Sequence, residues 1–163
     1  MLPRLALLAL PLFTQAALAA QTRSAPMTQT ATGSFEVTIT PEATNPAPEG
    51  GVGTGRMGLR KTFTGGLDGT ALGTMITAGQ PGAGTSAAYV AIDQFSGTLD
   101  GRRGGFVLLH RGTMTKAGAP DLAIVIAPDS GTGELEGIAG TFSIDLSGGK
   151  HLYTLNYSLP QQP

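Results

Sequence analysis

Residues 33–40 read GSFEVTIT, and apolar and polar side chains alternate through this stretch without a break. Phe35, Val37 and Ile39 fall on one side of an extended chain, and the serine, glutamate and threonines fall on the other. A period of two is the pattern of a β-strand with one buried face. We therefore predict a strand over residues 33–40, which ends at Pro41 because proline lacks the N–H that a sheet uses.

The same alternation recurs along the chain, with glycine and proline between the runs. Glycine contributes 25 of the 163 residues, about twice its usual share of ~7%. Outside the N-terminal leader, helical periodicity is missing, which predicts an all-β fold. Loops are expected at residues 42–53 and 79–84, and further strands at residues 54–64, 67–78, 86–95, 97–99, 105–114, 121–127, 140–146 and 150–159.

Two short signals predict how these strands connect. Asp100-Gly101 is typical of a type I′ hairpin turn, which needs a positive φ at both central residues. Gly65-Gly66 predicts a second tight turn. Eight or nine antiparallel strands protect their edges by stacking into a sandwich or by closing into a barrel. We favour a mostly antiparallel, closed, eight-stranded barrel that forms a single domain over residues 31–160.

The N-terminus has the layout of a secretory signal peptide over residues 1–19. Arg4 is followed by an apolar run at residues 5–13 and by the small-x-small sequence Ala17-Leu18-Ala19. The apolar run is much shorter than the roughly 20 residues that span a membrane, so we expect cleavage after Ala19 and no membrane span. The protein would then be periplasmic or secreted, with residues 20–30 as a flexible polar arm.

Composition narrows the range of partners. The chain has no cysteine, which excludes disulfides and a cysteine-linked lipid anchor. Its formal net charge is −1, and its basic residues form only small groups, at residues 56–61 and at Arg102-Arg103. Binding to a nucleic acid requires a basic patch, so we expect no nucleic-acid partner and interpret these charges as solvated.

One segment carries a family resemblance. Residues 131–140, GTGELEGIAG, are similar to the glycine motif of allene oxide cyclase and dirigent-type barrels. The wider pattern resembles a bacterial family of uncharacterised small proteins, a domain of unknown function with such a barrel. This similarity covers residues 31–37, 55–57, 97–102, 106–110 and 150–153.

The resemblance implies an allene oxide cyclase-like barrel with a central cavity, and it allows for a homo-oligomer. It implies no reaction, because the catalytic pattern of the plant cyclases does not match this sequence residue by residue. The plant enzymes also place a cysteine in their pocket, and this chain has none.

Familiar catalytic and cofactor motifs are missing from the sequence. It contains no G-x-S-x-G, H-E-x-x-H, C-x-x-C or P-loop, and we expect no cofactor. Thr132-Gly133 lies in a glycine-rich segment, but the lysine of a phosphate-binding loop does not follow it. We interpret this segment as a turn.

Alternation also predicts which polar side chains point into the barrel. Lys61 shares a face with Met57, Leu59 and Phe63, and His110 shares one with Phe106 and Leu108. Tyr89 and Asp93 share a face with Phe95, and Tyr153 shares one with Leu155. An apolar interior with a few polar groups is typical of a small-molecule pocket. Our ligand-binding candidates are Lys61, Tyr89, His110 and Tyr153.

The chemical role of these groups stays open. His110 beside a tyrosine or Lys61 would suit acid–base chemistry, whereas a core histidine bonded to the backbone is the simpler interpretation. His110, His151 and Asp93 together would suit a metal, but we predict no metal site. Glu36 lies opposite the apolar face and is expected in solvent.

Three classes of function remain. The favoured one is an exported barrel that binds a small, mostly apolar ligand in its interior. The alternatives are a structural or interaction barrel with a filled core, and a cyclase- or isomerase-like enzyme. What separates them is whether the barrel centre is open, which depends on strand tilt and stagger.

Overall fold

The computed structural model describes residues 27–79, 85–116 and 121–160. Within these ranges the chain forms strands, turns and loops, and no described segment is a helix that could cross a membrane. The predicted signal peptide and most of the predicted arm lie outside the described residues. The strands are β1 (Gln29–Asn45), β2 (Thr54–Gly65), β3 (Leu67–Gly79), β4 (Ala87–Leu99), β5 (Arg102–Met114), β6 (Asp121–Ile126), β7 (Thr132–Gly133), β8 (Ala139–Asp145) and β9 (His151–Ser158).

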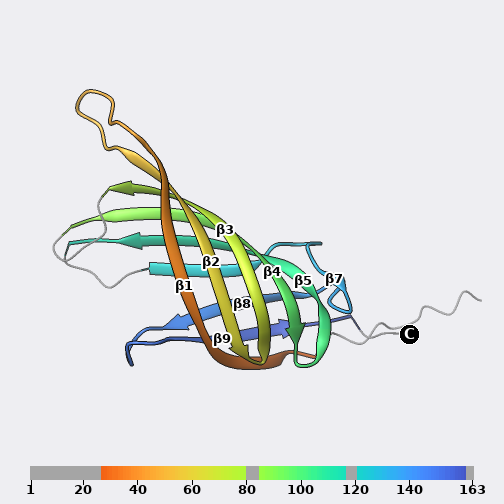
Figure 1. Ribbon diagram of the computed structural model, residues 1–163. Helices are drawn as coiled ribbons and strands as arrows, with labels where there is room; N and C mark the ends of the chain where they lie inside the picture. Colours follow the sequence, from red (N-terminus) through yellow and green to blue (C-terminus); the bar gives the residue numbers. More distant parts are fainter. Residues whose placement is uncertain (1–26, 80–84, 117–120, 161–163) are drawn as a thin grey trace, which may run out of the picture.

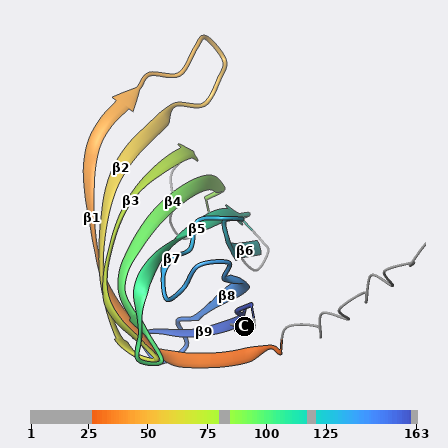
Figure 2. The same ribbon diagram turned by 90° about the vertical axis from the view of Figure 1, so that its right-hand side faces the viewer.

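Eight of these strands close into an antiparallel ring. Their order is β4-β3-β2-β1-β9-β8-β6-β5, and pairing of β5 with β4 completes the circle (Figures 1 and 2). The short β7 pairs only with β5 and lies outside the ring. The predicted all-β fold and the closed eight-stranded barrel are confirmed.

The first hairpin is longer than the sequence predicts. We expected β1 to end at Pro41, but it continues to Asn45, with a bulge between Pro41 and Ala43. In the described chain, β9 pairs with β1 only as far as Phe35, so Pro41 lies where one side of β1 is a free edge. A missing N–H is tolerated at such an edge. The hairpin of β1 and β2 therefore projects beyond the ring (Figure 1).

Two other predicted boundaries were wrong. β1 begins at Gln29, inside the predicted arm, because Thr30 pairs with Asn156 and donates a 2.8 Å hydrogen bond to its side chain. The predicted strands 86–95 and 97–99 are one continuous β4, in which Gly97 pairs with Gly69. A Cβ at Gly97 would lie 2.2 Å from the carbonyl oxygen of Asp68, so this glycine permits close approach and does not end the strand.

The turn between β4 and β5 has the predicted conformation. Asp100 has a φ of 47° and Gly101 a φ of 84°, as a type I′ turn requires. The carboxylate of Asp100 also accepts a 2.8 Å hydrogen bond from the hydroxyl of Tyr157 on β9. This contact ties the hairpin to the far side of the ring.

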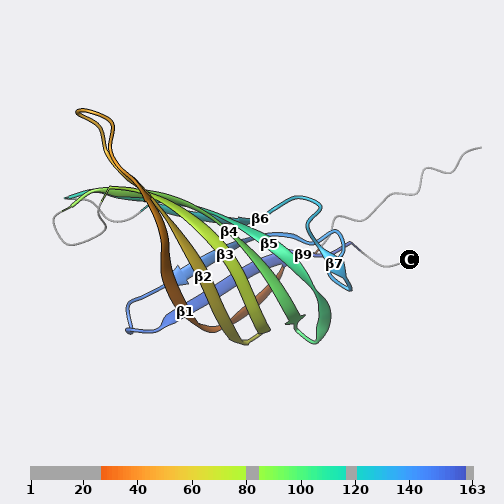
Figure 3. The same ribbon diagram turned by 45° about the horizontal axis from the view of Figure 1, so that its top comes forward.

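Aromatic side chains fill the half of the barrel nearest this turn. The rings of Phe95 and Phe106 lie 5.0 Å apart, and those of Phe142 and Tyr153 stack at 5.3 Å. Leu135 and Ile138, on the segment that contains β7, are buried in the same core. This segment lies across the end of the ring, as Figures 2 and 3 show. One end of the barrel is therefore closed by the chain itself.

Candidate functional site

The opposite half of the barrel holds a cavity of about 730 Å³. Its mouth lies where β3 and β5 end and where β4 and β6 begin. Three of the four predicted ligand-binding residues line it, namely Lys61, Tyr89 and His110. The barrel is thus neither wholly filled nor open throughout: it is a cup.

The walls of this cavity are mainly apolar. They come from the inward-facing positions of seven ring strands, as the predicted alternation requires. Apolar walls with a few polar groups are typical of sites that bind small molecules. The apolar lining includes Phe35, Val37, Leu59, Met75, Ala91, Leu122 and Ile144.

A buried cluster of three charged or titratable side chains lies between the cavity and the aromatic core. The ammonium group of Lys61 donates a hydrogen bond of 2.5 Å to Oδ2 of Asp93. Nε2 of His110 lies 2.9 Å from the same oxygen. Asp93 is fully buried, and Lys61 and His110 are 7% and 6% exposed. Asp93 is therefore the centre of the cluster, although it was not among our ligand-binding candidates.

The sheet brings these residues together through two small residues on β3. Lys61 on β2 pairs with Ala71, and Asp93 on β4 pairs with Gly73, so β3 lies between the lysine and the aspartate. Neither Ala71 nor Gly73 carries a side chain large enough to block this path. The long lysine side chain can therefore reach across β3 to the carboxylate.

Electrostatics keep Asp93 ionised. Burial alone would raise the pKa of Asp93, because a charged carboxylate loses its hydration. The contact with His110 and the positive charge of Lys61 outweigh burial and lower the pKa below its ordinary value of 3.8. At neutral pH the cluster contains a carboxylate paired with an ammonium group.

Hydrogen bonding in the cluster is incomplete. Although His110 is close to Asp93, its N–H direction does not meet the geometry of a hydrogen bond, so the contact is electrostatic. Among the described residues, Nε2 of His110 and Oδ1 of Asp93 are both buried without a hydrogen-bond partner. An unpaired buried polar atom costs about 1–3 kcal/mol. Such a cost is typical of sites kept for function.

Tyr89 lies closer to the mouth. Its ring packs against β5 at Gly112, where a Cβ would lie only 2.1 Å from a ring carbon. Burial, together with the negative charge of Asp93, raises the pKa of its hydroxyl above 10.0. Tyr89 therefore offers a phenol O–H to the cavity at neutral pH.

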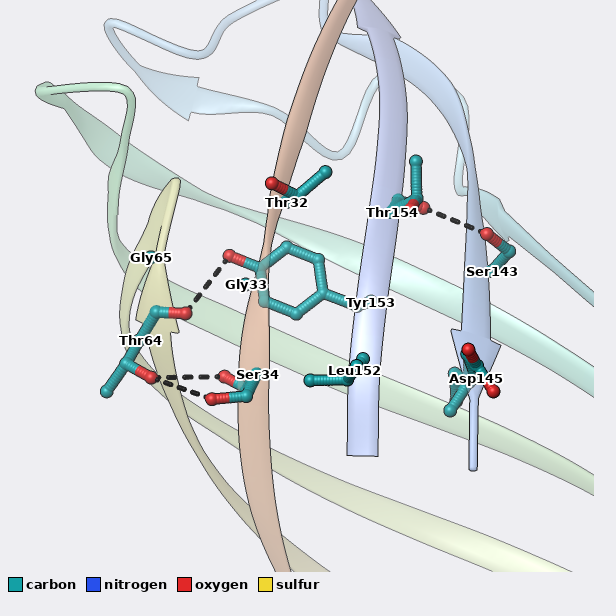
Figure 4. A pocket seen from close by; sticks show the side chains of 11 residues that line it. Thr32, Gly33, Ser34, Thr64, Gly65, Ser143, Asp145, Leu152, Tyr153 and Thr154 are labelled. Carbon is teal, nitrogen blue, oxygen red and sulfur yellow. Dashed lines mark hydrogen bonds between the residues drawn. The ribbon is translucent and has the colours of Figure 1, made fainter. Parts of the chain in front are cut away.

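The fourth candidate, Tyr153, does not line the cavity. It is buried against Gly33, where its hydroxyl accepts a 2.7 Å hydrogen bond from the backbone N–H of Leu67 and donates one of 3.4 Å to the carbonyl of Thr64 (Figure 4). Tyr153 borders a separate open groove of about 680 Å³. The polar groups of that groove bond one another, as Ser34 and Thr64 do at 3.1 Å. We therefore place the candidate site in the cup.

The two remaining polar candidates lie apart from the cluster. The ring of His151 packs on Phe35 at 4.9 Å and borders the cavity. Within the described residues no group of three histidine, cysteine, aspartate or glutamate side chains is arranged to hold a metal ion. Glu36 is exposed on the outer face.

Together the fold and the cavity define a class: a small antiparallel β-barrel closed at one end, with an internal site. The chain belongs to the DUF3224 family, described as proteins of unknown function, which matches residues 31–157. It is similar to a solved DUF3224 structure from Shewanella oneidensis MR-1, also of unknown function. The two are 42% identical, over 84% of this chain and 100% of the other, with a TM-score of 0.73. A search of the curated proteins finds no match.

Proposed function

We propose that this barrel binds a small, mostly apolar ligand in its cup. The observation that carries the proposal is the cavity of about 730 Å³ with apolar walls and three polar side chains, those of Lys61, Tyr89 and His110. A purely structural barrel would gain stability by filling this half with its own side chains, as it does in the other half. The cavity supports binding over a filled core.

Thermal unfolding tests this function directly. A ligand that binds only the folded state raises the unfolding midpoint, by about 2.7 kcal/mol at a hundredfold excess over its dissociation constant. The protein is screened with apolar compounds of different chain lengths and head groups. We expect a subset of them to raise the midpoint.

A matched pair of variants shows whether binding occurs in the cup. Met75→Trp fills the cavity from β3, whereas Ile76→Trp adds the same side chain to the outer face of the same strand. Binding should be lost in the first variant and kept in the second. Equal binding by both variants, or no binding by the wild-type protein, would contradict the proposal.

Proton transfer to a bound ligand is a second candidate function. The contact of 2.9 Å between Asp93 and His110 favours it, because a carboxylate beside an imidazole orients the ring and stabilises its protonated form. The test is deuterium uptake at the carbon next to a ligand carbonyl, followed by NMR in D₂O. His110→Phe should abolish the exchange while binding continues.

A further inference from the structure

We propose that the ligand carries an uncharged head group whose carbonyl oxygen accepts a hydrogen bond from Lys61, and that Asp93 makes the cup select against carboxylates. The head group would be that of a ketone, aldehyde, ester or amide. This inference rests on the proposed function, because it concerns the ligand of the same cavity.

The polar groups at the floor of the cup call for an acceptor. The ammonium group of Lys61 has three N–H donors, and Asp93 takes one of them. The ammonium also lies 5.3 Å from the ring centre of Phe35, a contact that uses charge but provides no acceptor oxygen. The phenol of Tyr89 adds another donor to the same cavity. A ligand oxygen would satisfy donors that the protein leaves free.

Charge selects the kind of acceptor. Asp93 already neutralises Lys61, so a carboxylate would bring an uncompensated negative charge into apolar surroundings. Two more carboxylates, those of Asp121 and Asp145, border the cavity and would repel an anion at the mouth. A carbonyl oxygen accepts the same hydrogen bond without these penalties.

The remaining charged or titratable groups that face the cavity are His110 and His151. Histidine ordinarily titrates near pH 6.5, so measurements at about pH 8 separate head-group selection from a positive imidazole. An ammonium ligand is attracted by the two carboxylates at the mouth, but at the floor it would meet Lys61. We therefore expect it to bind more weakly than a carbonyl compound.

The experiment compares three ligands of the same chain length. At about pH 8, 2-decanone, decanoate and decylamine compete with the neutral fluorescent probe N-phenyl-1-naphthylamine. We expect 2-decanone to bind roughly tenfold or more tightly than either charged ligand. Equal or tighter binding of decanoate or decylamine overturns the head-group inference but leaves the proposed function standing. If no ligand or probe binds, the proposed function fails and this inference fails with it.

Two variants assign the selection to the buried pair. Asp93→Asn leaves Lys61 without its counter-charge, so decanoate should gain roughly tenfold in affinity while 2-decanone changes little. Lys61→Met combined with Asp93→Asn removes both charges, and 2-decanone should lose its advantage over decanoate by a similar factor. If 2-decanone binds this double variant as it binds the wild type, Lys61 is not the donor and the inference is wrong. Circular dichroism verifies the fold, and the double variant carries the test if Asp93→Asn does not fold.

Discussion

Gly73 and Asp93 are paired residues on neighbouring strands, and a Cβ at Gly73 would lie 2.1 Å from Oδ1 of that aspartate. The same Cβ would lie 2.7 Å from the backbone oxygen of Ile92, so neither neighbour has room to move aside. Gly73→Ala should therefore destabilise the protein by about 1–3 kcal/mol, the usual range for overpacking. Urea unfolding followed by circular dichroism measures the loss.

Gly148→Ala is the matched control for this substitution. A Cβ at Gly148 would meet nothing within 4 Å. We expect this variant to differ from the wild type by less than about 0.5 kcal/mol, as surface substitutions usually do. Equal losses at both positions would show that crowding against Asp93 is not the cause.

Breaking the buried ion pair should be more harmful than removing it. Lys61→Met leaves Asp93 buried without its cation, which we expect to destabilise the fold by about 3–5 kcal/mol. Adding Asp93→Asn should recover much of that loss, because the uncompensated charge is gone. The control is Arg111→Ala, which breaks an exposed pair with Asp121 and should cost no more than about 1 kcal/mol. A double variant as unstable as Lys61→Met would contradict the prediction.

Stability should decrease in acid because of Asp93. The pKa of this carboxyl is lowered in the folded state, so its contribution is present above its ordinary value of 3.8 and disappears as the pH falls below that value. Between about pH 5 and pH 3, the wild type should lose more unfolding free energy than the variant with both Lys61→Met and Asp93→Asn. Parallel curves for the two proteins would mean that Asp93 does not cause the acid sensitivity.

All three tyrosines of the chain should resist ionisation. Burial raises the pKa of Tyr89 and of Tyr153, and burial together with the hydrogen bond to Asp100 raises the pKa of Tyr157 to about 12. At pH 10.0, ultraviolet absorbance should show less tyrosinate in the folded protein than in urea. The stability that these raised pKa values supply is present below pH 10.0 and is lost as the pH rises towards 12. Tyr157→Phe should remove the part that titrates last.

Export remains a prediction from the sequence. Residues 1–19 have the three-part pattern of a signal peptide, so the protein recovered from the cell envelope or the medium should lack them. Intact mass spectrometry and N-terminal sequencing measure the cleavage point, which we expect after Ala19. Full-length protein retained in the cytoplasm would refute the prediction.

Alternation predicted much of the site. A period of two places every second residue inside a small barrel, which correctly assigned Lys61, Asp93 and His110 to the interior. It could not show that Asp93 joins the other two. That contact depends on the register of β2, β3, β4 and β5 and on the small residues Ala71 and Gly73, whose importance emerges only when the strands are aligned.

The same argument explains the error over Tyr153. Alternation states on which face of the sheet a residue lies, but not at which height along the barrel axis. Tyr153 pairs with Gly33 and fills the space that this glycine leaves, so it belongs to the closed half and not to the cup. Pro41 and Gly97 misled us for a related reason, since a strand edge and a close strand approach are properties of the assembled sheet.

The segment that carries Leu135 and Ile138 leaves the cup with a single entrance. Whatever enters must leave by the same route, so arrival and departure cross one shared barrier. A substitution that only narrows the mouth should slow both rates by the same factor and leave the dissociation constant unchanged. A substitution on the floor, at Lys61 for example, should change mainly the departure rate. Stopped-flow measurements on the two kinds of variant would therefore distinguish the entrance of the cup from its binding groups.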